Sequence, residues 1–432
     1  MRDLFVAFIV FGSLPFILKR PFLGILMLAG LGYMNPHRLC YGFMFSMPVV
    51  MIVAVVTLIA MLASKEAKQM VWSREIVLLV IFIAWMGLTT SQAFYVDPAL
   101  VQYEKVVKIQ ILTFMTLLML TSRDRVHLLI WVIVLSLGLY GVKGGIFTIV
   151  NGGAYRVQGP MGSFIGGNNE MALALVMTVP LMRYLHLQEK NKFVRMGLAA
   201  GMFLTVIAAV GSQSRGALVG IVITGAIFWL KSRSKFVTAS FIVLSAMAAA
   251  TIMPVEWFER MDTIKTYQED GSAQGRINAW WTAYHLANDR VTGGGFETWQ
   301  APVFQRYAPN PADWRDVHSI YFEILGEHGY VGLALFLGIL GLTWLKCGSI
   351  IRFAKRNPDL IWARDLASMV QVSIVGYMSA GAFLGLAYFD YIYHLVAVVV
   401  VVHHLVTTQK STVAAGAAPP EALSLFGALR RA

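Results

Sequence analysis

The chain has 432 residues, of which 57% are hydrophobic and 13% charged, and its net charge is +12. With a mean hydropathy of +0.66, this composition excludes a soluble domain of this size. Apolar runs of roughly 17–25 residues recur along the chain, which is the length needed to cross the hydrocarbon core of a membrane. A β-barrel would show short alternating strands instead. We therefore expect an all-α polytopic membrane protein.

The excess of basic residues does not indicate nucleic-acid binding. Most Lys and Arg lie in short loops between apolar runs, where their orientation relative to the membrane explains them. Cys40 and Cys347 are expected near opposite membrane faces, which argues against a disulfide, and no Cys/His spacing is typical of a zinc site. The sequence thus predicts no metal, no cofactor and no nucleic-acid partner.

The apolar runs predict eleven spans in chain order. They lie near residues 41–63, 75–93, 100–121, 126–150, 168–187, 194–211, 215–231, 235–253, 318–346, 365–386 and 388–408. Residues 4–34 are also apolar but contain Pro15, Lys19, Arg20 and Pro21, so they form either one span with a re-entrant piece or two short spans. No small-residue cleavage site follows this run, which indicates a retained first span. A cytoplasmic N-terminus would bring the total to 12.

Basic and non-basic loops alternate along the chain. Every second loop carries Lys or Arg, and the intervening loops are poor in both for their length. This alternation places the basic loops in the cytoplasm and the long loop 254–317 outside. It divides the chain into four regions. These are membrane helices in 1–253, the outer loop 254–317, C-terminal spans in 318–408, and a disordered cytoplasmic tail at 409–432.

The outer loop is the one long polar segment of the chain. It holds five of the 11 tryptophans, namely Trp257, Trp280, Trp281, Trp299 and Trp314. Apolar side chains recur at intervals of three and four residues between Ser272 and Asn288, which predicts a helix there. The glycine run 293–295 ends that helix or turns the chain. The tryptophans form either a belt at the membrane interface or stacking surfaces for sugar rings.

Several arginines lie at the outer face, against the orientation trend. Arg215 opens a span after small polar residues, Arg276 lies on the loop helix, and Arg156 lies in the loop 151–167. A guanidinium group binds phosphate oxygens bidentately. The structural alternative is a salt bridge or a side chain that reaches lipid phosphate. The small residues around Arg215 allow close backbone approach and favour the ligand interpretation.

Three lysines are candidates for the same role. Lys143 lies inside the span 126–150, and Lys105 and Lys108 lie three residues apart in the outer part of their span. A cation within a span indicates a functional site or a buried pair with a carboxylate. The sequence leaves both interpretations open for all three.

His318 lies where the outer loop re-enters the membrane. A neutral imidazole there can accept a proton from a sugar hydroxyl, although a histidine that caps a helix would stand at the same position. His285 is a weaker candidate. The loop carboxylates offer no pair that stands out by spacing; they are Asp262, Glu269, Asp270, Glu297, Asp313 and Asp316, with Glu323 in the next span. No nucleotide or dinucleotide motif is present.

Three segments together resemble the superfamily of O-antigen ligases and O-antigen polymerases. They are residues 212–217 (Ser-Gln-Ser-Arg-Gly-Ala), residues 275–280 followed by Gly293 to Phe296, and residues 317–329, which contain His318 and a Glu-x-Gly sequence. Ser319 departs from the pattern, because Asn is commoner there. Residues 141–145 and 166–170 are similar to the N-terminal region of a subgroup of O-glycosylation ligases.

The resemblance implies a GT-C-like membrane fold of about 12 helices with one large periplasmic loop. It also implies inverting, metal-independent glycan transfer at the periplasmic face of the bacterial inner membrane. The donor would be a glycan on undecaprenyl diphosphate, and the acceptor a sugar hydroxyl of lipid A–core. Arg215 and Arg276 would bind the donor diphosphate, and His318 would be the base. Further candidates for substrate binding are Arg156, Lys143, Lys105, Asn168, Asn169 and Trp280.

Other activities fit the same residues. A protein O-oligosaccharyltransferase would use the same donor with a Ser or Thr hydroxyl, and an O-antigen polymerase would use another lipid-linked glycan as the acceptor. A transporter of lipid-linked glycans would instead show charges in the middle of many spans and an internal repeat. The charges concentrate at the outer edge here and no repeat is visible, which favours a transferase.

Overall fold

The computed structural model describes residues 1–413 apart from residues 67, 267, 269 and 356. Tyr267, Glu269 and the disorder predicted for most of the tail therefore lie outside the described residues. Every regular element of the described chain is helical, with no strand. Eight of its helices are long and apolar enough to cross a membrane. The all-α polytopic fold class is thus confirmed, whereas the total of 12 spans stays a prediction.

A helix covers each of the predicted apolar runs. The helices before the outer loop are α1 (Arg2–Lys19), α2 (Pro21–Met34), α3 (Val49–Ala63), α4 (Arg74–Ser91), α5 (Val96–Met119), α6 (Arg123–Val150), α7 (Asn168–Gln188), α8 (Lys192–Gly211), α9 (Arg215–Lys231) and α10 (Lys235–Ile252). The outer loop holds α11 (Val255–Asp262), α12 (Gly271–Asp289) and α13 (Ala301–Tyr307), and α14 (Ile320–Ala354), α15 (Ile361–Ala380) and α16 (Asp390–Val413) follow it.

The N-terminal apolar segment forms two helices. Arg20 has an extended backbone between them, and Pro21 is the first residue of α2, where its missing N–H is not needed by the helix. The predicted helix at 272–288 is confirmed by α12, whose bounds lie one residue outside it on each side.

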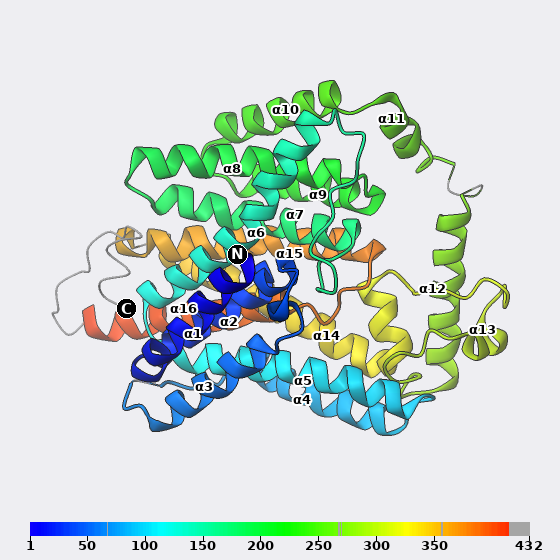
Figure 1. The fold of residues 1–432 in the computed structure, drawn as a ribbon, viewed down its shortest axis with the longest axis horizontal. Coiled ribbons are helices and arrows are strands. Elements are labelled where there is room, and N and C mark those ends of the chain that lie inside the picture. Colours follow the sequence, from blue (N-terminus) through cyan, green and yellow to red (C-terminus); the bar gives the residue numbers. More distant parts are fainter. Residues whose placement is uncertain (67, 267, 269, 356, 414–432) are drawn as a thin grey trace.

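The long helices form one bundle with a buried centre. α15 packs against α7, α9 and α14, and α6 packs against α7 and α8. In α16, 72% of the most apolar window is buried, compared with 11% in α10. α10 therefore lies at the periphery, packed mainly on the neighbouring helices α8 and α9 (Figure 1). Figure 1 also shows α12 running across the ends of the long helices, with α13 beside it and α11 near the end of α10.

A kink in α14 attaches the outer loop to the bundle. Gly329 has φ +66° and ψ −171°, so the helix breaks there and the preceding carbonyls lose their helical partners. Gly294 N donates to the Gly326 carbonyl at 2.8 Å, and Gly295 N donates to the Glu327 carbonyl at 2.9 Å. The indole of Trp85 donates to the third carbonyl, that of His328, at 2.9 Å. The glycine run thus completes the broken turn of α14.

Candidate functional site

Arg215 is held at the outer end of the bundle by the start of α9. The Ser214 side chain caps the helix by accepting from Ala217 N at 3.2 Å. Gly216 lies against the 3-10 helix that follows α15, where an added Cβ would come within 2.6 Å of Phe383 Cβ. Because Arg215 is the first helical residue, its side chain is directed toward the outer loop rather than into the bundle.

Asp270 binds Arg215 through both carboxylate oxygens. Arg215 Nη1 donates to Asp270 Oδ2 at 2.6 Å and Nη2 donates to Oδ1 at 3.1 Å. Nη1 also donates to the Thr263 hydroxyl at 2.7 Å. Asp270 caps α12 by accepting from Ala273 N at 2.8 Å. The hydrogen bonds from Arg215 lower the pKa of Asp270 to about 2, so the carboxylate is ionised at physiological pH.

Arg276 lies one and a half turns into α12 and faces the same space as Arg215. Among the described residues its guanidinium has no hydrogen-bond or ion-pair partner, and its Nε is buried. Burial, followed by the nearby charge of Arg215, lowers its pKa. Such a half-buried unpaired cation costs free energy unless an anion accompanies it.

Two more arginines lie near this pair. The Nε of Arg260, on α11, is also buried without a partner among the described residues. Burial, followed by the charges of Arg156 and Arg215, lowers the pKa of Arg260. The structure thus brings Arg156, which the sequence singled out, to the same cluster. Arg260 was missed, because nothing in its local sequence distinguishes it from a solvated loop charge.

A pocket of about 310 Å³ lies between the two predicted donor-binding arginines. We call it the arginine pocket. Its walls come from α9, α12, the segment that follows α11 and the 3-10 helix η4 (Gly381–Phe383) after α15. They consist of Arg215, Gly216, Val219, Thr263, Ile264, Ala273, Arg276, Ile277, Trp280 and Phe383. The charged groups therefore stand in largely apolar surroundings, where an ionic contact is stronger than in water.

Trp280 connects the arginine pocket to His318. Its ring stacks on Phe322 with centroids 5.1 Å apart and an interplanar angle of 9°, and its indole N–H donates to the Val317 carbonyl at 2.9 Å. Val317 directly precedes His318. The pocket wall and the predicted base are thus fixed to each other through one side chain.

His318 has a carboxylate partner that spacing did not reveal. Its Nδ1 lies 3.0 Å from Asp316 Oδ2, and 36% of its side chain is exposed. When Nδ1 donates to this carboxylate, Nε2 is left as a proton acceptor. The backbone of His318 has φ +45°, an uncommon value for a non-glycine residue. The adjacent Ser319 hydroxyl is buried without a partner in the described part of the chain.

A second polar group lies behind this site, inside the bundle. We call it the carboxylate network: Glu327, His328, Tyr388 and Thr89. The Tyr388 hydroxyl donates to Glu327 Oε2 at 2.5 Å and lies 2.9 Å from His328 Nε2, and His328 Nδ1 lies 2.7 Å from the Thr89 hydroxyl. Glu327 Oε1 accepts from Glu297 N at 3.2 Å. Sequence analysis missed this network because its members come from α4, α14 and the turn before α16, which are distant in the sequence.

The remaining predicted residues fall into two sets. Asn168 donates to the Ser212 carbonyl at 2.9 Å and so supports the segment before Arg215, and Asn169 is half-buried in the first turn of α7. The three lysines do not line the arginine pocket. Lys105 donates to Gln102 at 3.3 Å, Lys108 pairs with Glu104 at 2.5 Å, and Lys143 is exposed on α6.

Comparison with known families separates the chain into two parts. Residues 200–337 match the model of the O-antigen ligase family, and residues 1–191 match a family of unknown function, DUF5935. The first match contains Arg215, Arg276 and His318. No curated protein matches the chain.

Proposed function

Because this multi-pass membrane protein contains an O-antigen ligase family domain, we propose that it transfers a glycan from undecaprenyl diphosphate to a sugar hydroxyl of lipid A–core. The proposed reaction takes place at the periplasmic face of the bacterial inner membrane. The family match supports glycan transfer of the ligation or polymerisation type. The donor, the acceptor and the mechanism are our proposal.

The observation that carries the proposal is the unpaired Arg276 beside Arg215 in one pocket. Arg156 and Arg260 lie near these two, and among the described residues Asp270 is the one carboxylate that bonds to any of the four arginines. In the reaction the leaving group is a diphosphate, whose negative charge grows as the C1–O bond breaks. Fixed guanidinium groups in apolar surroundings stabilise that charge without reorganisation. This arrangement supports a lipid diphosphate as the donor.

His318 would act on the acceptor. Its Nδ1 is engaged by Asp316 at 3.0 Å, so Nε2 can take the proton of the acceptor hydroxyl as that oxygen attacks C1. The C1–O bond to the diphosphate breaks as the new bond forms on the opposite face, which inverts the configuration. The proton passes from His318 to water. The diphosphate bond supplies the free energy, so ATP is not required, and the arginines would stabilise the leaving diphosphate in place of a metal ion.

Three kinds of acceptor fit the same donor site. A protein hydroxyl or a second lipid-linked glycan could be attacked by the same chemistry, and the arginine pocket would serve all three reactions. A transporter would need the arginines but not a histidine base beside them. The test therefore has to vary the acceptor and His318 separately.

The decisive experiment is glycan transfer by purified protein in detergent with EDTA. Undecaprenyl-diphosphate glycan is offered with lipid A–core and, separately, with a Ser-rich acceptor protein. We expect transfer to lipid A–core, and a loss of about 10²–10⁴-fold in His318→Ala. His285→Ala is the matched control, because His285 lies on α12 and contacts the Tyr307 carbonyl at 2.8 Å instead.

Other outcomes are equally informative. Transfer only to protein would show that the ligase assignment is wrong while the donor chemistry holds. Transfer that EDTA abolishes would contradict metal independence. Donor binding without transfer to either acceptor would favour the polymerase or the transporter.

A further inference from the structure

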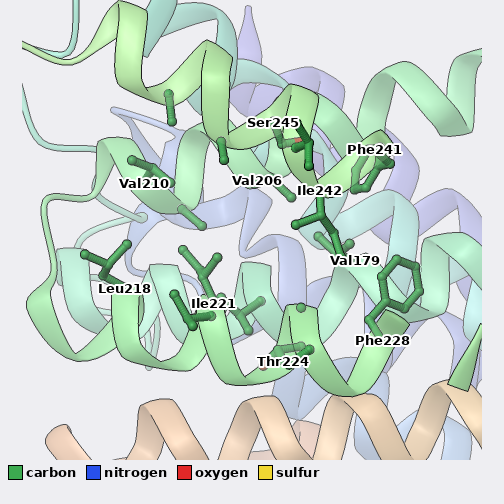
Figure 2. Close-up of a pocket in the computed structure, with 18 of the residues that line it drawn as sticks. Val179, Val206, Val210, Leu218, Ile221, Thr224, Phe228, Phe241, Ile242 and Ser245 are labelled. Atoms are coloured by element: carbon green, nitrogen blue, oxygen red, sulfur yellow. The ribbon is translucent and has the colours of Figure 1, made fainter. Parts of the chain in front are cut away.

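A second hollow, larger than the arginine pocket, lies within the membrane-spanning part of the protein. We call it the α8–α10 groove. It measures about 630 Å³ and lies between α7, α8, α9 and α10 (Figure 2). Its walls include Val206 and Val210 of α8, Leu218 and Ile221 of α9, and Phe241 and Ile242 of α10. Two of the residues that line it, Thr224 and Ser245, carry hydroxyls, and both oxygens are buried, so the groove offers too few polar groups to bind a sugar.

The groove opens toward lipid rather than toward water. Val222 on α9 and Val243 on α10 line it and are 64% and 54% exposed. α10 packs on the bundle mainly through α8 and α9 (Figure 1). An apolar chain can therefore enter sideways from the bilayer.

Two elements connect the groove to the arginine pocket. On α9, Arg215 binds Asp270 at the first helical position, and Leu218 lines the groove three residues later. On the short helix α11, Trp257 and Phe258 line the groove and Arg260 belongs to the arginine cluster. One ligand with a charged head and an apolar tail would contact both spaces at once.

We propose that the α8–α10 groove binds the isoprenoid tail of a polyprenyl diphosphate whose diphosphate lies at Arg215 and Arg276. The inference rests on the proposed function and adds the site for the lipid part of the donor. Trp257 lines the groove three residues before Arg260 on α11, and its buried indole N–H has no partner among the described residues. It would donate a hydrogen bond to the phosphate end of the tail.

The groove would mainly orient the donor, and the transfer of the tail from the bilayer into the groove would add little binding free energy. Lipid tails are as apolar as the groove wall, so a chain that moves from the bilayer into the groove gains packing but little desolvation. Holding the first isoprene units still fixes the diphosphate and hence the direction of the C1–O bond. We therefore expect a moderate effect on affinity.

The first test fills the groove. An added Cβ at Gly225 meets nothing nearer than Ile242 Cδ1 at 4.0 Å, so Gly225→Phe places a ring in the groove without backbone strain. In nanodiscs, the Kd of undecaprenyl diphosphate should rise about tenfold, whereas the Kd of citronellyl diphosphate, which has a two-isoprene tail, should change less than about twofold. Gly341→Phe on α14, where a Cβ has open space, is the control and should leave both unchanged.

The second test locates the tail. A diazirine placed in the isoprene units nearest the diphosphate should label α9 and α10 in the groove, and excess phosphatidylglycerol should not suppress the labelling. Labelling of other helices, efficient competition by phosphatidylglycerol, or an unchanged Kd in Gly225→Phe would overturn the proposal. These readouts measure binding alone. If the groove is labelled as expected but the protein transfers no glycan, the result would instead count against the proposed function.

Discussion

The arginine pocket and the carboxylate network lie at the same end of the bundle but differ in how their polar groups are satisfied. In the carboxylate network, Glu327, His328 and Tyr388 are bonded to one another and to neighbouring backbone. Arg276, in the arginine pocket, and Arg260, near it, each keep a buried Nε without a partner among the described residues. A polar network that is fully bonded specifies structure, whereas an incompletely bonded cluster of like charge is suited to an anionic ligand.

Burial and hydrogen bonding give different indications of the roles of charged residues in these two regions. Glu327 and His328 are more deeply buried than any arginine of the pocket, yet their partners lie in the protein. Arg276 is less buried and has no such partner. Unsatisfied bonding therefore indicates ligand binding better than burial does, and the two regions should respond differently to mutation.

The largest effect is expected when the unpaired guanidinium is removed. Arg276→Ala should lower kcat/KM for transfer by about 10²–10³-fold, because a charge that stabilises the leaving diphosphate is lost. Arg276→Lys should recover only part of this, since an ammonium group lacks the bidentate geometry. Thermal unfolding should change little, which distinguishes a ligand site from a structural one.

The control for Arg276 is another arginine of the outer loop. Arg306 on α13 pairs with Asp289 at 3.0 Å and is 66% exposed. Arg306→Ala should keep transfer within about twofold, as expected for a surface ion pair. Equal losses in both variants would mean that the pocket has no special role.

An intermediate effect, on stability rather than on activity, is expected beside the carboxylate network. Gly329→Ala should destabilise the protein by roughly 1–3 kcal/mol, because φ +66° with ψ −171° is a conformation suited to glycine. The measurement is thermal unfolding in detergent. Gly341→Ala, in regular helix with open space at its Cβ, should instead be neutral or stabilising by up to about 1 kcal/mol. If the two variants unfold alike, the kink does not need glycine.

A smaller effect is expected at the one carboxylate bonded inside the arginine pocket. Asp270→Asn should tighten the binding of undecaprenyl diphosphate about threefold to tenfold, because the competing charge is lost while Asn still caps α12. The lowered pKa of Asp270, about 2, means that the wild-type pair persists at any practical assay pH. Asp313→Asn is the control, since Asp313 pairs with Arg315, which does not line the pocket. Weaker binding in Asp270→Asn would mean that Asp270 positions Arg215 rather than competing for it.

Local patterns predicted more of the fold than of the site. Three- and four-residue spacing was sufficient for α12, and apolar length was sufficient for the helices of the bundle. The kink at Gly329 was not predicted, because the apolar pattern of α14 continues through it. Its cause is tertiary: the glycine run supplies the amides that the broken turn lacks.

The site was predicted by residue type but not by pairing. Arg215, Arg276 and His318 followed from short motifs that resemble a family. The pairing of Arg215 with Asp270 joins residues 55 positions apart, and neither position carries information about the other. The contribution of Arg260 depends on where α11 docks, which no local pattern determines. The roles proposed for all of these residues remain to be tested.

The salt bridge between Arg215 and Asp270 has a consequence for turnover. On the proposed function, the product is a lipid diphosphate with one more free oxygen than the donor, so it carries more charge and would be the tighter ligand of the arginines. Asp270 gives Arg215 a partner to return to when that product leaves. On the same proposal, the carboxylate would act as an internal counterion that limits product inhibition and lowers donor affinity in exchange for faster release.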